Sequence, residues 1–518
     1  ENARRLFRAI DASSSFEKTG SDELVTRGSA ELFPYSRRVV KELRARLNDE
    51  QWRVVRDVSL GVAAVAGEGG ASLGPPYCAF GPPGTGKTVT VVAAIVAVLA
   101  TQADARVLVC APAPFAADVV CSRLADLTKE LRAAAVADGD DAPPPALEPV
   151  SLTSLPSPNS NELQASWTMV RVNDPRRDPA SVKSDVVRFC AASGSESAAA
   201  RNARVVVASC ASAGLLAEAF ATANGGREFP QTKSDFNANE QKGASSFAFT
   251  HVLVDEAGQA TVPETLVPLR MTSGKTTRAV VLAGDPKQLG PVVHAASASA
   301  LRDSLLASAV RAHEAEEKKR ASSSSSAGDA TRSLRLVKLV RNYRSHEDIF
   351  GLSSRLFYEN ALVAAAPEDN VSLPKSLVGD VGAENGTREK KATNEAEAEN
   401  EDENENGRPA RVLFVGVRGV QTREGTGEAP SFFNAMEART LVDLLSTWLG
   451  DEQISEKDRN ENEEKGDAPA ATGDSQATYA DASADGTLRL RTCDVGVIAP
   501  YRAQVVRLRM LLRARGLG

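Results

Sequence analysis

The residues GPPGTGKT at positions 81–88 match the spacing G-x-x-x-x-G-K-[ST] of a loop that binds nucleotide phosphates. Glycines let backbone N–H groups close around phosphate oxygens, and the N-terminus of a following helix adds positive charge. Lys87 can then reach the β- and γ-phosphates of ATP, while the hydroxyl of Thr88 can bind Mg²⁺. A glycine–proline turn without a ligand is the alternative interpretation. The pattern predicts ATP contacts from Gly81, Pro82, Pro83, Gly84, Thr85, Gly86, Lys87 and Thr88.

An acidic pair, Asp255-Glu256, directly follows the apolar run 252–254. At the C-terminal end of a strand, Asp255 can bind Mg²⁺, and Glu256 can orient and deprotonate an attacking water. An isolated pair of this kind is more often a surface turn. Because the pair follows a phosphate-binding loop in the same chain, the catalytic interpretation is favoured.

Two later polar segments could complete a site for phosphoryl transfer. Gln288 lies in 284–291, GDPKQLGP, and could contact the γ-phosphate. Arg344 lies in 341–346, RNYRSH. An arginine from a second domain would balance transition-state charge that Lys87 and Mg²⁺ leave uncompensated. Each segment taken alone is also consistent with a polar or basic surface turn.

Short runs rich in Val, Leu, Ile and Ala precede several of these motifs. Because they are continuously apolar, they indicate strands buried on both faces. Helical stretches at 89–101 and 118–131 fall between them, which predicts an α/β fold with a parallel sheet. The expected strands are Tyr77–Phe80, Arg106–Ala111, Arg204–Ser209, His251–Asp255, Ala279–Gly284, Arg411–Val415 and Asp494–Ala499.

The charge distribution is compatible with nucleic acid as a partner. The net charge is −7, but the tracts 384–406 and 451–485 carry −6 and −8, so the rest of the chain is mildly basic. Both tracts lack the apolar residues that would offset the entropy of ordering, which predicts disorder.

Composition excludes several other classes. The six cysteines form no CxxC pair and the four histidines are scattered, which favours reduced thiols and no zinc site. The longest apolar run, 89–100, is too short to cross a bilayer, so no membrane association is expected. No secretory signal opens the chain, which indicates the cytoplasm, with the nucleus as the alternative.

The ordered set of motifs resembles the superfamily 1B, up-frameshift-like RNA helicases. Within that group the chain looks most like the silencing-defective and Moloney-leukaemia-virus-resistance branch, as Leu32-Phe33-Pro34 and Ser431–Asn434 indicate. The motifs that carry the resemblance are Asn48–Gln51, GPPGTGKT, VLVDEAGQA, LAGDPKQLGPVV, RNYRSH and Val495–Gln504.

The resemblance implies a P-loop NTPase with two RecA-like domains and ATP between them. It implies that Gln51 reads the adenine edge, that Tyr343 stacks on the base, and that Gln288 and Arg344 contact the γ-phosphate. It further implies 5′-to-3′ movement on single-stranded RNA, with small-RNA silencing or mRNA-decay factors as partners. The implied RNA contacts are Pro112, Ser209, Pro500, Tyr501 and Arg502.

The expected organisation follows from the motifs and the composition. The chain lacks an initiator methionine and the helicase motifs expected after Leu512, which indicates a fragment of low or no activity with an incomplete second domain. The expected parts are a pre-helicase segment at 1–48, a first RecA-like domain at 49–320 with an irregular insertion at about 132–202, a Ser-rich linker at 321–332, and a partial second RecA-like domain at 333–518 with disordered acidic insertions at 384–408 and 451–487.

Departures from the family pattern leave alternatives open. Ala113 and Phe115 stand where the family has polar residues, and Ser209-Cys210 replaces a threonine pair. An ATP-gated RNA clamp or scaffold that does not unwind remains an alternative. Because the residues do not themselves distinguish RNA from DNA, a DNA helicase of the same superfamily is another. The sequence does not indicate an oligomeric state.

Overall fold

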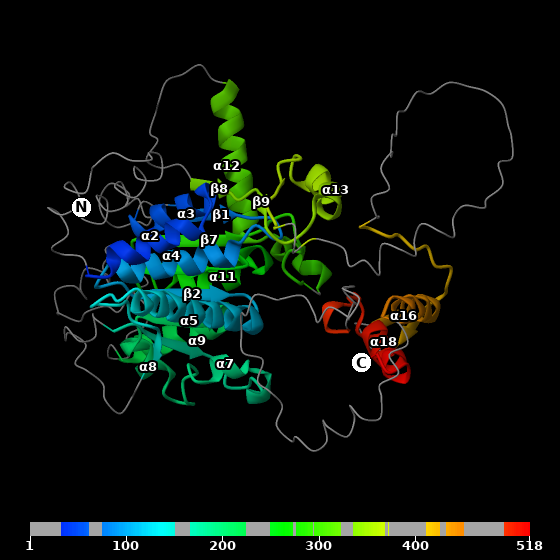
Figure 1. Cartoon of the computed structure of the whole chain (residues 1–518), viewed down its shortest axis with the longest axis horizontal. Coiled ribbons are helices and arrows are strands. Elements are labelled where there is room, and N and C mark those ends of the chain that lie inside the picture. The colour runs from blue at the N-terminus through cyan, green and yellow to red at the C-terminus, as the bar shows by residue number, and fades with distance from the viewer. Residues whose placement is uncertain are drawn as a thin grey trace. The chain divides into compact units, whose positions relative to one another are not determined.

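The computed structural model describes residues 33–61, 75–150, 166–223, 249–272, 276–293, 295–322, 335–367, 371, 411–424, 431–449 and 492–517. The chain divides into two units, the first within 1–345 and 353–366 and the second within 346–352 and 367–518; their labelled elements can be followed in Figure 1. The expected acidic insertions, 384–408 and 451–487, lie outside the described residues, as do 1–32 and 323–332.

The first unit is built on an eight-stranded sheet in which every neighbouring pair is parallel. This confirms the predicted α/β fold with a parallel sheet. In spatial order the strands are β3 (Glu148–Pro149), β4 (Thr168–Val172), β5 (Val205–Ser209), β2 (Val107–Ala111), β6 (His251–Val254), β7 (Ala279–Gly284), β1 (Tyr77–Phe80) and β8 (Arg335–Lys338).

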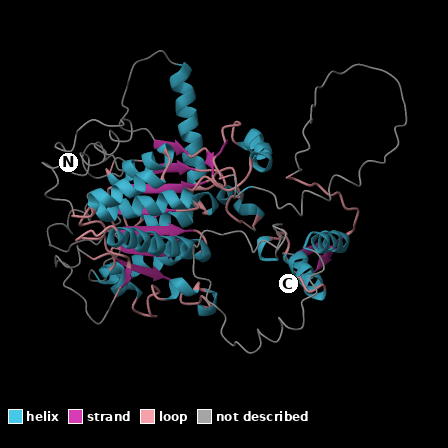
Figure 2. Cartoon of the chain, viewed as in Figure 1, coloured by secondary structure: helices cyan, strands magenta, loops and turns pink. Residues whose placement is uncertain are grey.

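Helices cover both faces of this sheet, so the central strands are buried on each side (Figure 2). One face packs against α2 (Ser36–Arg46), α3 (Asp49–Ser59), α4 (Lys87–Thr101), α5 (Pro114–Ala137) and α7 (Ser184–Val187). The other packs against α8 (Glu196–Asn202), α9 (Cys210–Ala223), α11 (Val262–Leu269) and α12 (Leu305–Ser322). Three short 3₁₀ helices connect them, at Pro179–Ser181, Ala257–Gln259 and Ala296–Arg302. Among the residues described, no helix is both long and apolar enough to cross a bilayer.

The described part of 132–202 is ordered, whereas an irregular insertion was expected there. α5 runs to Ala137, and β4 pairs with β5 inside the sheet. In β4, Arg171 is fully buried, and its Nε donates to the carboxylate of Asp118 at 2.9 Å. Arg177 forms a second ion pair with the same carboxylate. Because a buried charge interrupts its apolar pattern, the strand could not be predicted from periodicity.

The first compact unit continues past the domain boundary that was expected at 321–332. β8 pairs with the phosphate-loop strand β1, and the N–H of Leu339 donates to the carbonyl of Phe80 at 2.8 Å. A short parallel pair follows, β9 (Arg341–Asn342) with β10 (Val363–Ala364). The segment RNYR therefore belongs to the first unit.

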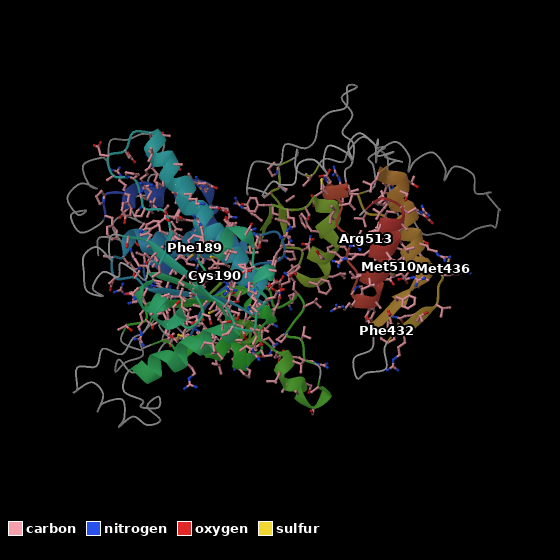
Figure 3. All side chains as sticks on the ribbon, turned by 90° about the horizontal axis from the view of Figure 1, so that it is seen from below. Phe189, Cys190, Phe432, Met436, Met510 and Arg513 are labelled. Carbon is pink, nitrogen blue, oxygen red and sulfur yellow. The ribbon has the colours of Figure 1, made fainter. Side chains whose placement is uncertain are left out.

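The described residues of the second unit contain one antiparallel pair, β11 (Gln421–Glu424) with β12 (Ser431–Asn434). Helices α16 (Ala435–Leu449) and α18 (Arg502–Ala514) pack together through Val442 and Leu508, and Figure 3 labels Met436 and Met510 on these two helices. A 3₁₀ helix spans Thr492–Asp494, and α13 (Glu347–Phe357) is divided between the units.

The strands expected at 411–415 and 494–499 are not formed in the described residues. The side chains of Phe414 and Ile498 are 93% and 96% exposed. An apolar run makes a buried strand only where a neighbouring strand supplies hydrogen bonds and a covering face. Neither run has such a neighbour among the residues described.

Replacement of Asp118 by alanine should destabilise the first unit. Arg171 would keep its buried charge and lose its carboxylate partner, which typically costs about 3–5 kcal/mol of unfolding free energy. The control is Asp303→Ala, which removes an exposed ion pair with Arg311 and should cost less than about 1 kcal/mol. Urea unfolding followed by circular dichroism measures both. Equal, small losses would mean that the buried cluster contributes no more than a surface pair.

Candidate nucleotide-binding site

The phosphate loop joins β1 to α4 at the carboxyl edge of the sheet. Gly84 and Gly86 have φ angles of 77° and 80°, a region that favours glycine. A side chain at Gly81 would lie 2.5 Å from Cγ of Lys87, so glycine is required there as well. Lys87 is the first residue of α4, which places its backbone at a helix N-terminus. The local backbone therefore has the features that a phosphate-binding loop requires.

The two residues predicted to hold Mg²⁺ are directly hydrogen-bonded. Oγ1 of Thr88, in α4, donates to Oδ2 of Asp255 at the end of β6, at 2.8 Å. Burial, followed by the neighbouring charge of Glu256, raises the pKa of Asp255 to about 6, against the lowering effects of Thr88 and Lys87. A hydroxyl beside a carboxylate is a set of hard oxygen ligands that suits Mg²⁺. These two residues therefore fit the ion that the fold implies.

Glu256 is held in a conformation that is unfavourable for its residue type. Its φ angle is 53°, in the left-handed region that non-glycine residues rarely adopt. Nε2 of Gln259 donates to its carboxylate at 3.2 Å and orients it. Gly258 keeps this turn close to β7, because a side chain there would lie 2.6 Å from the carbonyl oxygen of Asp285. Strain of this kind is commonly concentrated at functional sites.

The buried carboxylate of Asp285 organises the segment after β7. It accepts hydrogen bonds from Nε2 of Gln288 at 2.7 Å and from the hydroxyl of Tyr358 at 2.8 Å. Burial, followed by this hydrogen bond, raises the pKa of Tyr358 well above its usual range, so the hydroxyl stays protonated and donates. Gln288 itself is exposed beyond the strand end, where a γ-phosphate contact is expected. Neither Asp285 nor Tyr358 is predicted from the sequence as a site residue.

Gln51 is placed beside the phosphate loop and is almost fully buried. Its Oε1 accepts from the N–H of Asn48 at 3.1 Å in a helix-capping box, and its Nε2 donates to the carbonyl of Thr85 at 3.0 Å. Its amide therefore supports the loop directly. One N–H and one lone pair remain for the adenine contact that the resemblance implies.

Tyr343 and Arg344 lie against the same loop, within the first unit. The N–H of Tyr343 donates to the carbonyl of Gly84 at 2.8 Å, and its hydroxyl accepts from Nδ2 of Asn48 at 2.8 Å. The ring of Tyr343 is 39% exposed, which leaves a face free to stack on a base. An arginine from a second domain was expected; β8 carries the chain back onto the first sheet, and Arg344 groups with the first unit.

The residues expected to contact RNA are placed in both units. Pro112 follows β2 at the edge of the sheet that carries the phosphate loop. The hydroxyl of Ser209 is buried and donates to the hydroxyl of Ser212 at 2.8 Å, so it is not presented to a ligand. Pro500, Tyr501 and Arg502 are exposed in the second unit. There the ring of Tyr501 packs edge-on against Phe432, which Figure 3 labels.

A phosphate loop, an oxygen-ligand pair and a carboxylate at the edge of a parallel sheet define the class as a P-loop NTPase with a RecA-like core. Two family models, each described as an AAA domain, match residues 47–216 with 236–296 and residues 325–517. The chain belongs to the superfamily 1, up-frameshift-like helicases.

The similarity to known helicases extends over most of the chain. It is 32% identical to RNA helicase Mov10l1 of Homo sapiens over 442 residues, which are 85% of this chain and 26% of the relative. It is 27% identical to putative helicase MOV-10 of Gallus gallus, over 91% of this chain and 37% of the relative. It is 28% identical to probable RNA helicase armi of Drosophila melanogaster, over 71% and 26%. The chain thus spans about a quarter to somewhat over a third of these relatives.

Replacement of Asp255 by asparagine should stabilise the fold near neutral pH. In the folded protein the pKa of Asp255 is raised to about 6. The contribution of this carboxyl to the free energy of unfolding is therefore fully present below the pKa of the unfolded state, and it is lost as the pH rises through 6. Asparagine removes the buried charge, so its advantage should grow from about pH 4 to about pH 7 and then level off at up to about 3 kcal/mol.

Thermal unfolding without Mg²⁺ or nucleotide, at several pH values, measures this difference. Asp303→Asn, at an exposed ion pair, serves as the control and should show no comparable growth with pH. A constant difference between Asp255→Asn and the wild type from pH 5 to pH 8 would contradict the assignment of a buried charge.

Proposed function

We propose that this protein is an ATP-dependent RNA helicase, which hydrolyses ATP to move 5′ to 3′ along single-stranded RNA and to unwind or remodel it. The observation that carries the proposal is the direct hydrogen bond between Thr88 and Asp255, with Glu256 adjacent. It brings together a phosphate loop, a metal-ligand pair and a base, which is the set that phosphoryl transfer to water requires.

The hydrolytic step follows from the placement of the chain's own groups. The loop's backbone N–H groups and Lys87 bind the β- and γ-phosphates. Glu256, oriented by Gln259, takes a proton from the attacking water. Gln288 and Arg344 contact the γ-phosphate as charge develops on its oxygens. Bound by Thr88 and Asp255, Mg²⁺ would neutralise part of the phosphate charge.

Support for RNA comes from the relatives and from the edge of the sheet. Mov10l1 and armi are named RNA helicases. On this edge, α5 begins at Pro114 without a side-chain cap, which leaves N–H groups for a phosphate of the strand. Phe115, in its first turn, is 63% exposed and can stack on a base. We further propose a role in RNA silencing, with small-RNA silencing or mRNA-decay factors as partners, from likeness to the same relatives. Localisation to the cytoplasm is proposed from the sequence alone.

A strand-displacement assay tests the helicase activity. Duplexes with a 5′ single-stranded overhang, made of RNA or of DNA, should be separated only with ATP and preferentially when the loading strand is RNA. ATP hydrolysis without strand separation would instead support a clamp, and equal use of DNA would remove the RNA assignment.

Lys87→Ala and Glu256→Gln should each lower RNA-stimulated ATP hydrolysis at least about 100-fold. Glu256→Gln should still bind ATP, because it removes the base and leaves the phosphate loop intact. Release of labelled phosphate and binding of a fluorescent ATP analogue measure the two effects. Lys129→Ala, on the exposed part of α5, is the control with unchanged turnover. Near-native turnover in Glu256→Gln would refute its assignment as the base.

Phe115→Ala should weaken binding of single-stranded RNA by roughly 5- to 150-fold, because it removes a stacking surface. Binding of ATP should be unchanged. Val136→Ala, at the other end of α5, removes an apolar side chain of similar exposure and should leave RNA affinity unchanged. Fluorescence anisotropy with a labelled oligonucleotide measures both variants. If both variants match the wild type, Phe115 does not contact RNA.

A further inference from the structure

Asn342 is a buried polar residue that joins the arginine-bearing segment to the phosphate loop. It is 2% exposed and ends the short strand β9. Its Nδ2 donates to the carbonyl of Pro83 at 2.9 Å. Its Oδ1 accepts from the backbone N–H groups of Arg344 and Ser345, each at 2.9 Å. One side chain thus contacts the loop with one end and fixes the backbone of Arg344 with the other.

These contacts fit an amide and no other side chain of the same size. The carbonyl of Pro83 needs a donor, whereas the two N–H groups need an acceptor, and the amide of asparagine supplies both. The same segment is also bound through its backbone, since the N–H of Tyr343 donates to Gly84. Because a buried polar group left without a partner is costly, each end of Asn342 is committed to its contact.

The loop is shaped to receive this segment. A side chain at Gly84 would lie 2.8 Å from Cβ of Arg344 and 2.9 Å from the amide of Asn342. Only a glycine therefore allows the backbone of Arg344 to approach the loop so closely. Arg344 itself is exposed, while its backbone N–H is fixed by Asn342.

We propose that Asn342 is a positioning residue, which sets the reach of Arg344 toward the γ-phosphate by tying its backbone to Pro83. This inference rests on the proposed function, because it assigns Asn342 to the hydrolysis of ATP. A purely structural role of Asn342 would require only the turn at Arg344 and Ser345. In the proposed role, ATP turnover depends on the contact between Asn342 and Pro83.

Asn342→Asp separates these two roles. Aspartate has the same shape and keeps the acceptor for Arg344 and Ser345, but it places a second acceptor against the carbonyl of Pro83. Asn342→Ala removes all three hydrogen bonds. Asn202→Asp is the matched control, since the amide of Asn202 also donates to a carbonyl, that of Ala198 at 2.8 Å, far from the site in sequence.

The experiment measures ATP turnover at pH 8, which favours the ionised form of the introduced carboxyl. Asn342→Asp and Asn342→Ala should both lower kcat at least about tenfold, and Asn202→Asp should have no effect. Circular dichroism and binding of a fluorescent ATP analogue verify that each variant is folded and binds nucleotide. Turnover of Asn342→Asp equal to wild type would overturn the proposal, because the link to Pro83 would then be unused.

A double-mutant cycle tests whether Asn342 acts through Arg344. In single-turnover measurements, Asn342→Asp should add no further loss to Arg344→Ala, because the group that it positions is gone. Losses of turnover that multiply would show an independent effect and overturn the proposal.

A wild-type protein that does not hydrolyse ATP would overturn the proposed function and this inference together. Turnover by the wild-type protein, together with unchanged turnover in Asn342→Asp, would overturn this inference alone.

Discussion

The hydrogen bond between Thr88 and Asp255 is the interaction on which the site depends. It connects the helix after the phosphate loop to the end of β6, although the two residues are 167 positions apart in the chain. Parallel strands end at a common edge, so β1, β6 and β7 deliver their loops to one place. A buried carboxylate without this partner and without a cation would be costly, so the bond also stabilises Asp255.

The phosphate loop is held by segments from three distant parts of the chain. Gln51 binds the carbonyl of Thr85, and Asn342 binds that of Pro83. On the remaining side, the N–H of Gly81 donates to the carbonyl of Gly284 at 3.1 Å. Two carbonyls of the loop, those of Thr85 and Pro83, and one N–H, that of Gly81, are therefore bonded to other parts of the chain. These contacts fix the backbone of the loop, on whose shape an anion site depends.

The core of the first unit could be predicted because its strands are continuously apolar and its motifs follow them directly. β1 and β7 coincide with the expected runs, while β4 could not be found, since Arg171 breaks its pattern and only the fold supplies Asp118 as a partner. Similarly, the role of Asn342 depends on contacts with a loop 259 positions away, which no local spacing encodes. The runs at 411–415 and 494–499 were expected to be strands, but they form none in the described residues. An apolar composition is not sufficient for a strand where no neighbouring strand supplies hydrogen bonds.

Several unfavourable features of the structure lie where the chemistry is expected. Glu256 has a left-handed backbone, Asp255 has a raised pKa, and Gly84 and Gly86 lose the most conformational entropy on folding. The eight-stranded sheet beneath them is buried on both faces by apolar side chains. A few kcal/mol of local strain can therefore be maintained, because a large apolar core offsets it. The same rigidity keeps the carboxylates at a fixed distance from the phosphate loop, which is what electrostatic catalysis requires.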